Sequence, residues 1–195
     1  SFDRYHSKAE SIYKIVQDTK MGDETHHWNT TAYPLAEAIR NDFPQLPFVT
    51  QASGPVSRFF ESQDAEGNII RFEEPFVLFV DPWYTKVFDV TWIEGDPATA
   101  LRHTNSVVLT RSVAEKYFPE DVRKNSILGK QLLLNNKDPL TITGLLEDAP
   151  PNSSLQYSML IPYEFFRINN QYYASNWSGN YQGTTFIVMN PELKV

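Results

Sequence analysis

Short apolar and alternating segments, separated by turn residues, follow one another along most of the chain. Runs rich in β-branched and aromatic residues predict strands, and apolar residues at i, i+4 spacing predict helices. The expected strands cover residues 12–16, 57–60, 69–72, 76–80, 90–93, 107–109, 131–134, 141–146, 155–161 and 184–189. The expected helices cover residues 35–43, 83–88, 110–118 and 163–168. The pattern predicts an α+β fold.

Turn residues join some of these segments into hairpins. Residues 64–68 and 135–139 are rich in Asn, Asp, Gly and Pro, and each stretch separates two extended segments. In the expected helix 110–118, Ser112 and Glu115 stand at capping-box spacing, and Pro119 is expected to end the helix. We find no internal repeat and no low-complexity tract, so the chain is not a solenoid or propeller.

The aromatic residues are numerous, and one group of them stands in a polar context. At least two of the four tryptophans are expected in the core. Residues 169–183 are expected to form a polar loop, and its aromatic side chains resemble an adaptable contact surface. The candidate partner-contact residues are Tyr172, Tyr173, Trp177 and Tyr181, with core packing as the alternative role.

Composition narrows the class of protein. Of the 195 residues, 41% are apolar and 21% are charged, as in ordinary globular domains. A net charge of -7 without clustered Lys and Arg argues against nucleic acid as a partner. Cysteine is absent, so neither a disulfide framework nor a thiolate metal site can form. No apolar run approaches the ~20 residues that span a bilayer.

Candidate catalytic groups have simpler explanations. His26 and His27 are adjacent, which is unsuitable for sharing one metal ion, so we expect them in a surface loop. Glu73-Glu74 and Glu147-Asp148 could suggest an acid and a base, but neighbours on a strand point to opposite faces. The chain also lacks a Gly-rich phosphate loop. We therefore expect no enzyme activity, no cofactor and no metal, and specifically no binding of ATP or zinc.

A series of short motifs occurs in order along the chain, at residues 2–6, 12–14, 34–36, 42–44, 94–97, 100–101, 105–110, 114–118, 128–130 and 143–150. This ordered series resembles the MacB-like periplasmic core domain of FtsX-like ABC-transporter permeases. The first part of the chain is similar to the segment that follows the first transmembrane helix in those permeases. The family usually has Gly directly after the Phe that ends the helix, whereas Phe118 is followed by Pro119.

The resemblance implies a two-lobed architecture. Residues 1–98 and 163–195 would form a porter-like lobe, and residues 99–162 would form a smaller inserted α+β lobe. It also implies a periplasmic domain of a bacterial inner-membrane protein, without chemistry of its own. Its partners would be a second permease copy, a cytoplasmic ATP-binding subunit and a periplasmic protein. The domain would couple ATP hydrolysis to export, lipoprotein release or mechanotransmission.

Two other classes of function stay open at this point. The aromatic segment would also suit a free-standing periplasmic carbohydrate- or peptide-binding module, and carboxylates distant in sequence could belong to a hydrolase. Because the sequence begins at Ser1 without Met, we expect it to be a piece of a longer membrane protein. As an isolated piece, it is expected to be a monomer, because the membrane helices and ATP-binding domains would hold most of the dimer contacts.

Overall fold

The computed structural model describes residues 10–64, 66–151, 153, 155–178 and 183–189. Its strands are β1 (Ile12–Lys14), β2 (Gln17–Met21), β3 (Glu24–Trp28), β4 (Phe48–Gln63), β5 (Ile69–Val80), β6 (Trp92–Gly95), β7 (Ser106–Thr110), β8 (Gln131–Leu134), β9 (Asp138–Leu146), β10 (Met159–Pro162) and β11 (Gly183–Val188). Its helices are α1 (Leu35–Asp42), α2 (Tyr84–Val87), α3 (Arg111–Tyr117), α4 (Pro119–Lys124), α5 (Tyr163–Asn169) and α6 (Gln171–Ser175). These elements confirm the α+β class.

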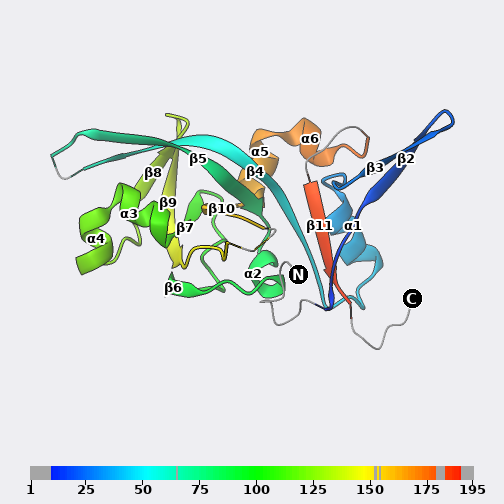
Figure 1. Ribbon diagram of the computed structural model, residues 1–195, viewed down its shortest axis with the longest axis horizontal. Helices are drawn as coiled ribbons and strands as arrows, with labels where there is room; N and C mark the ends of the chain where they lie inside the picture. The colour runs from blue at the N-terminus through cyan, green and yellow to red at the C-terminus, as the bar shows by residue number, and fades with distance from the viewer. Residues whose placement is uncertain (1–9, 65, 152, 154, 179–182, 190–195) are drawn as a thin grey trace.

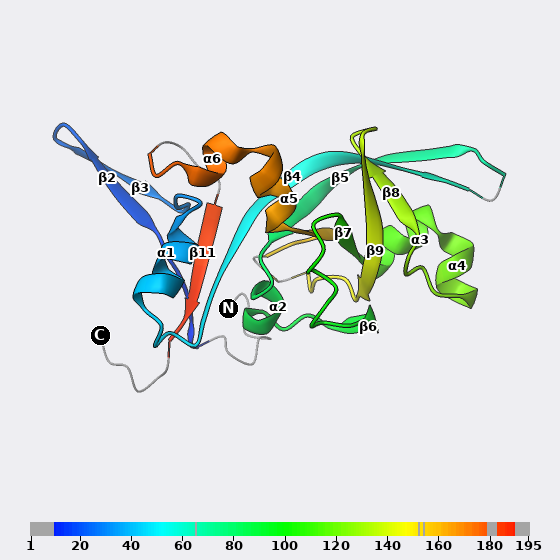
Figure 2. The ribbon, with the colours of Figure 1, turned by 180° about the vertical axis from the view of Figure 1, so that it is seen from behind.

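One mixed sheet carries most of the fold. Its strands follow the order β1-β11-β4-β5-β10-β7-β9-β6, and β8 pairs with both β4 and β9. Figure 1 shows β4 and β5 arching over the molecule, with α3 and α4 lying under the far end of this hairpin. The separate β2–β3 ribbon projects from the opposite end of the molecule, as the reverse view in Figure 2 also shows.

Strand β4 pairs with three other strands of this sheet, β11, β5 and β8. Over residues 48–53 it pairs with β11, and at Phe60 and Glu61 it pairs with β8. Between these two stretches its register against β5 shifts twice, around Val56. Gly54 has φ +117° there, a conformation that glycine adopts readily. A β-bulge therefore bends the strand between its two sets of partners.

The core consists of two clusters of buried apolar side chains, both centred on the sheet. Strands β7 and β10 are buried at every position, which explains their nearly continuous apolar sequences. One cluster includes Phe79, Leu109 and Phe165, and the other includes Val80 and Phe186 among its members. Both clusters draw residues from either side of the boundaries 98/99 and 162/163. The division into two lobes stays a prediction.

Two glycines of the predicted family motifs lie opposite each other. Gly95 in β6 pairs with Gly144 in β9. A Cβ atom on Gly144 would lie 2.5 Å from Cζ3 of Trp92, and one on Gly95, whose φ is +97°, would lie 2.6 Å from the carbonyl oxygen of Thr143. The two glycines of the motifs thus allow a close approach of two backbones. A larger residue at either position would prevent it.

The beginning of α3 differs from the expected capping box. No side chain at the N-cap Thr110 bonds to the helix, and Glu115 is exposed. Instead, Asp148 accepts hydrogen bonds from Ser112 N at 3.2 Å and Ser112 Oγ at 2.7 Å. The capping carboxylate comes from a distant segment, so local spacing could not identify it. Pro119 follows the end of α3 as expected, but it also begins α4, because proline suits the first helical turn.

Three further expectations were wrong in detail. The stretch around His26 and His27 is not a loop but strand β3, which pairs with β2. The strand expected at 155–161 begins only at Met159. No tryptophan is fully buried, since Trp28, Trp83 and Trp92 are partly buried and Trp177 is exposed. Trp92 packs against the edge of the second core cluster, which leaves part of its ring in contact with solvent.

We expect Gly144→Ala to lower the free energy of unfolding by about 1–3 kcal/mol, because the added methyl group would overlap the Trp92 ring. Urea titration followed by circular dichroism measures the change. Trp92→Leu removes the clashing atom, so the double variant should show a coupling energy above ~0.5 kcal/mol. Purely additive effects of the two substitutions would contradict the proposed steric cause.

We expect Asp148→Ala to destabilise the protein by about 1 kcal/mol, because it removes the acceptor that caps α3. Asp148→Asn keeps an acceptor oxygen and should lose less. Glu115→Ala is the matched control and should change stability by less than ~0.5 kcal/mol. Thermal unfolding measures the stability of the three variants. A loss of stability in Glu115→Ala as large as in Asp148→Ala would instead support the local capping box.

Candidate functional site

The predicted contact residues lie on and directly after α6, which replaces the expected loop. Tyr172, Tyr173 and Trp177 are 72%, 52% and 58% exposed. The rings of the two tyrosines meet edge to face, with centroids 5.4 Å apart. The structure therefore brings three of the four candidate residues onto one short exposed segment. Tyr181 lies outside the described residues.

Helix α5 attaches this segment to the core. Phe165 is buried and stacks on Phe79 with ring centroids 6.3 Å apart, while Phe166 lies 4.9 Å from the ring of Tyr33. At the end of α5, the Nδ2 groups of Asn169 and Asn170 donate to the carbonyl oxygens of residues 165 and 166. These bonds satisfy carbonyls that the helix end leaves unpaired. The exposed aromatic rings thus directly follow a helix that is packed against the core.

The chemistry of the aromatic segment is polar but uncharged. No Asp, Glu, Lys, Arg or His occurs between Arg167 and Glu192. Tyr, Trp, Asn and Ser dominate residues 169–178, a composition typical of surfaces that bind other proteins through rigid aromatic rings and adaptable hydrogen bonds. In Figure 1, α6 lies on the side of the molecule opposite the end where β11 and β1 meet the start of β4. The segment can therefore contact a partner without involving that end.

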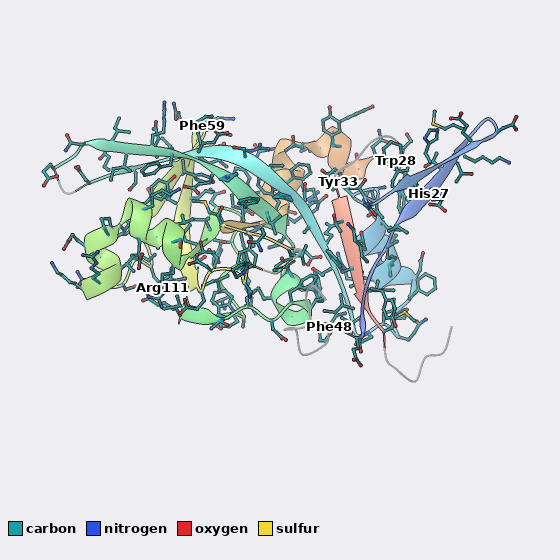
Figure 3. The ribbon with its side chains drawn as sticks, viewed as in Figure 1. His27, Trp28, Tyr33, Phe48, Phe59 and Arg111 are labelled. Atoms are coloured by element: carbon teal, nitrogen blue, oxygen red, sulfur yellow. The ribbon has the colours of Figure 1, made fainter. Side chains whose placement is uncertain are left out.

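The two candidate histidines are held on opposite faces of the β2–β3 ribbon. His27 Nδ1 lies 2.6 Å from Asp18 Oδ1, and His26 Nε2 lies 3.7 Å from Glu24 Oε2. Figure 3 shows His27 on this projecting ribbon. Among the residues that the structure describes, no group of three or more His, Cys, Asp or Glu side chains is placed to hold a metal ion. The two histidines therefore do not share a ligand set.

The paired carboxylates bind to other parts of the fold. Glu74 is buried, and it accepts from Lys116 Nζ at 2.7 Å and from Tyr117 OH at 3.2 Å. Burial, followed by the charge of Glu74, raises the pKa of Tyr117 above its usual value. Glu73 is exposed on the other face. The two residues therefore cannot act on one substrate bond. Glu74 instead fixes α3 to β5.

The second carboxylate pair secures the end of β9. Arg111 donates two bonds to Glu147, at 3.1 and 2.8 Å, and the hydrogen bond from Arg111 is the main cause that lowers the pKa of Glu147. Figure 3 places Arg111 on the side of the molecule opposite Phe59. Together with Asp148, this pair ties the start of α3 to the end of the neighbouring strand.

Sequence reasoning missed a buried polar centre at Asp81. Its carboxylate accepts from Arg40 Nη1 at 2.9 Å, Thr50 Oγ1 at 2.5 Å and the backbone N–H groups of Gln51 and Trp83 at 3.1 Å. Burial raises the pKa of Asp81, while the bonds from Thr50 and Arg40 oppose this effect. The signal available in the sequence was an Asp-Pro pair directly after a buried strand, which is also an ordinary turn.

The Asp81 centre borders a cavity of about 520 Å³ between α1, the residues directly before α2, and α5. The guanidinium of Arg40 lies 4.3 Å from the centre of the Trp83 ring at its wall. Arg40, Arg102 and Arg167 contribute three positive charges to the lining, and Glu37, Asp81 and Glu164 contribute three negative ones. Because these charges balance and Arg40 and Arg167 are already paired, the cavity has no strong preference for a charged ligand.

No helix in the described part of the chain is long and apolar enough to cross a membrane.

Comparison with known proteins gives one family, and two crystal structures illustrate the similarity of fold. The family model of the MacB-like periplasmic core domain matches residues 1–192. A domain of a protein described as a permease, from Porphyromonas gingivalis, is 22% identical with a TM-score of 0.76, over 97% of this chain and 77% of that one. The periplasmic region of MacB from Actinobacillus actinomycetemcomitans is 15% identical with a TM-score of 0.59, over 94% and 77%.

A search of curated proteins found no match. The two crystal structures show that the fold is shared, and the family match covers nearly the whole chain. This family is a class of permease domains and not a class of enzymes. The chain belongs to the family of MacB-like periplasmic core domains, which are periplasmic domains of ABC-transporter permeases.

Proposed function

We propose that this domain transmits motion from the membrane part of an ABC-transporter permease to a partner in the periplasm. The path of β4 is the observation that supports the proposal most directly. At its first residue, Phe48, it pairs with Val188, and near its far end Phe60 pairs with Leu134 of β8. One strand of 16 residues, about 50 Å long if fully extended, thus connects β11 with the β8–β9 hairpin.

The ends of the described chain meet at the first end of β4. Val188 pairs with Ile12 of β1, and Met189 N donates to Ser11 O at 2.9 Å. The first and last described residues therefore lie side by side, which suits a domain that is moved from a single attachment. Because protein interiors are densely packed, a displacement there would be passed through the sheet rather than absorbed locally.

The energy and the partners of this motion would come from other polypeptides. The chain contains no Gly-x-x-x-x-Gly-Lys-Ser/Thr sequence, so a cytoplasmic ATP-binding subunit would supply the hydrolysis. A second permease copy would complete the transporter. A periplasmic protein would dock on the aromatic segment of Tyr172, Tyr173 and Trp177, and Tyr181 would extend that surface. Export and lipoprotein release are the kinds of work that such transmission would serve.

A free-standing carbohydrate- or peptide-binding module is the competing proposal. It would account for the exposed rings of α6, since aromatic faces stack on sugars and peptides. It gives no role to the pairing of the two chain ends or to the long β4 strand. Family membership also favours the transporter role.

A distance measurement in the full permease tests the transmission proposal. Gln171→Cys on α6, introduced in both permease copies after removal of other cysteines, takes a spin label on each copy. We expect ATP to shift the distance distribution between the labels, and an ATP-binding subunit that cannot bind ATP should abolish the shift. Identical distributions with and without ATP would overturn the proposal.

We expect the triple substitution of Tyr172, Tyr173 and Trp177 by Ser to abolish function in a deletion strain complemented with the full gene. Stability of the isolated domain should change by less than ~0.5 kcal/mol, because all three side chains are exposed. Ile69→Ser on the tip of the β4–β5 hairpin is the control, with a side chain 67% exposed, and should retain function. Full activity of the triple variant would exclude this surface from the mechanism.

We expect the isolated domain to sediment as a monomer at low micromolar concentration. Among the described residues, the exposed large apolar side chains are spread over the ribbon, the loop before β4, the β4–β5 hairpin, β6 and the α5–α6 segment. A stable dimer buries at least ~1,200 Å² in one interface, and these side chains come from separate elements. Analytical ultracentrifugation measures the state directly. A tight dimer at that concentration would mean that the periplasmic domain itself holds the transporter together.

A further inference from the structure

The loop between α1 and β4 is apolar and free of charge. Its sequence is Phe-Pro-Gln-Leu-Pro-Phe at residues 43–48. Phe43 is 50% exposed, and Leu46 and Phe48 are each partly exposed. Single exposed apolar residues are normal in proteins, but here the exposed Phe43 stands three residues before the partly exposed Leu46. Phe48 packs with part of its side chain against the second core cluster. Gln45 is the only side chain in the loop with hydrogen-bonding groups.

The loop holds these side chains in place. Phe43 N donates to Ile39 O at 2.8 Å at the end of α1, and Leu46 N donates to Phe43 O at 3.1 Å, closing a turn. Pro44 and Pro47 fix φ at two further positions. Because the loop is already ordered, contact through its apolar side chains would cost little additional conformational entropy.

The loop lies beside the first and last described strands, β1 and β11. Its last residue, Phe48, begins β4 and pairs with Val188, which pairs with Ile12 on its other side. Figure 3 shows Phe48 at the lower edge of the molecule, where β1, β4 and β11 converge. In Figure 1, α6 lies on the upper side of the molecule. The apolar loop and the aromatic segment therefore face in different directions.

We propose that residues 43–48 contact the lipid surface of the periplasmic leaflet and seat the domain on the membrane. This inference rests on the proposed function, in which the domain is attached to the membrane part of the permease at this end of the sheet. Phe and Leu side chains partition into the boundary between headgroups and acyl chains, and the strength of such contact grows with the apolar area buried.

The composition of the loop favours lipid over a protein as the occupant. A protein interface normally needs about one hydrogen bond per 100–200 Å², and this loop offers only one polar side chain. The loop itself carries no charge, so it has no electrostatic attraction to anionic headgroups. The contact would therefore be driven by apolar burial and would be insensitive to salt, unlike contact through a basic segment.

A fluorescent label on the loop tests this proposal. Because the chain has no cysteine, Gln45→Cys provides a single attachment point for an environment-sensitive nitrobenzoxadiazole dye and leaves Phe43 and Leu46 intact. Gln171→Cys on α6 is the matched control, since Gln171 is also exposed. Each labelled domain is tethered by an N-terminal histidine tag to vesicles of phosphatidylethanolamine and phosphatidylglycerol that contain a nickel-chelating lipid.

We expect a blue shift and a severalfold rise in emission at position 45 only, unchanged in high salt and abolished by Phe43→Ser with Leu46→Ser. No change at 45, or an equal change at 171, would overturn the proposal. A shift without vesicles that grows with protein concentration would also overturn it, because a second copy would then cover the loop. If the label at position 45 stays unchanged while ATP still shifts the distance between the labels in the full permease, the membrane-contact proposal is wrong and the transmission proposal stands.

Discussion

Backbone hydrogen bonding along β4 is the constraint on which the rest of the structure depends. The strand has 16 residues, and its buried N–H and C=O groups must find partners on both edges. One edge is paired with β5, and the other is shared between β11 and β8. The last strand of the described chain and a hairpin from its middle are thereby fixed relative to each other. The bulge near Val56 lets one strand serve both sets of partners.

Sequence reasoning was most accurate where local pattern and burial agree. Helix 35–43 was predicted to within one residue, because its apolar spacing and Pro44 both act locally. The β2–β3 ribbon was missed because its strands bury no continuous face, so no apolar alternation marks them. The cap of α3 was misassigned for the opposite reason: Asp148 is 36 residues from Ser112, and only tertiary structure brings them together.

The family motifs became informative only when their contacts were known. Gly95 and Gly144 allow two strands to approach, while Glu147 and Asp148 hold α3. These residues are restricted by packing, so their pattern identifies a fold and carries no direct information on a transported substrate. The candidate contact surface has the opposite character. Tyr172 and Tyr173 were proposed as contact residues because several aromatic residues stand in a polar, Gly-containing segment. The helix that presents them was not predicted.

The loop at residues 43–48 and the segment around α6 lie on opposite sides of the molecule and differ in chemistry. This difference explains how one domain could contact two neighbours. The loop at residues 43–48 has apolar side chains and few hydrogen-bonding groups, which suits lipid. The segment around α6 has aromatic rings with hydroxyl and amide groups, which suits a protein surface. The sheet joins the two through Phe48 at the start of β4 and through β5, against which Phe165 of α5 packs by way of Phe79. If the loop sits on the membrane, a tilt of the sheet about that contact would displace α6 by more than it displaces the loop, because α6 lies farther from the pivot.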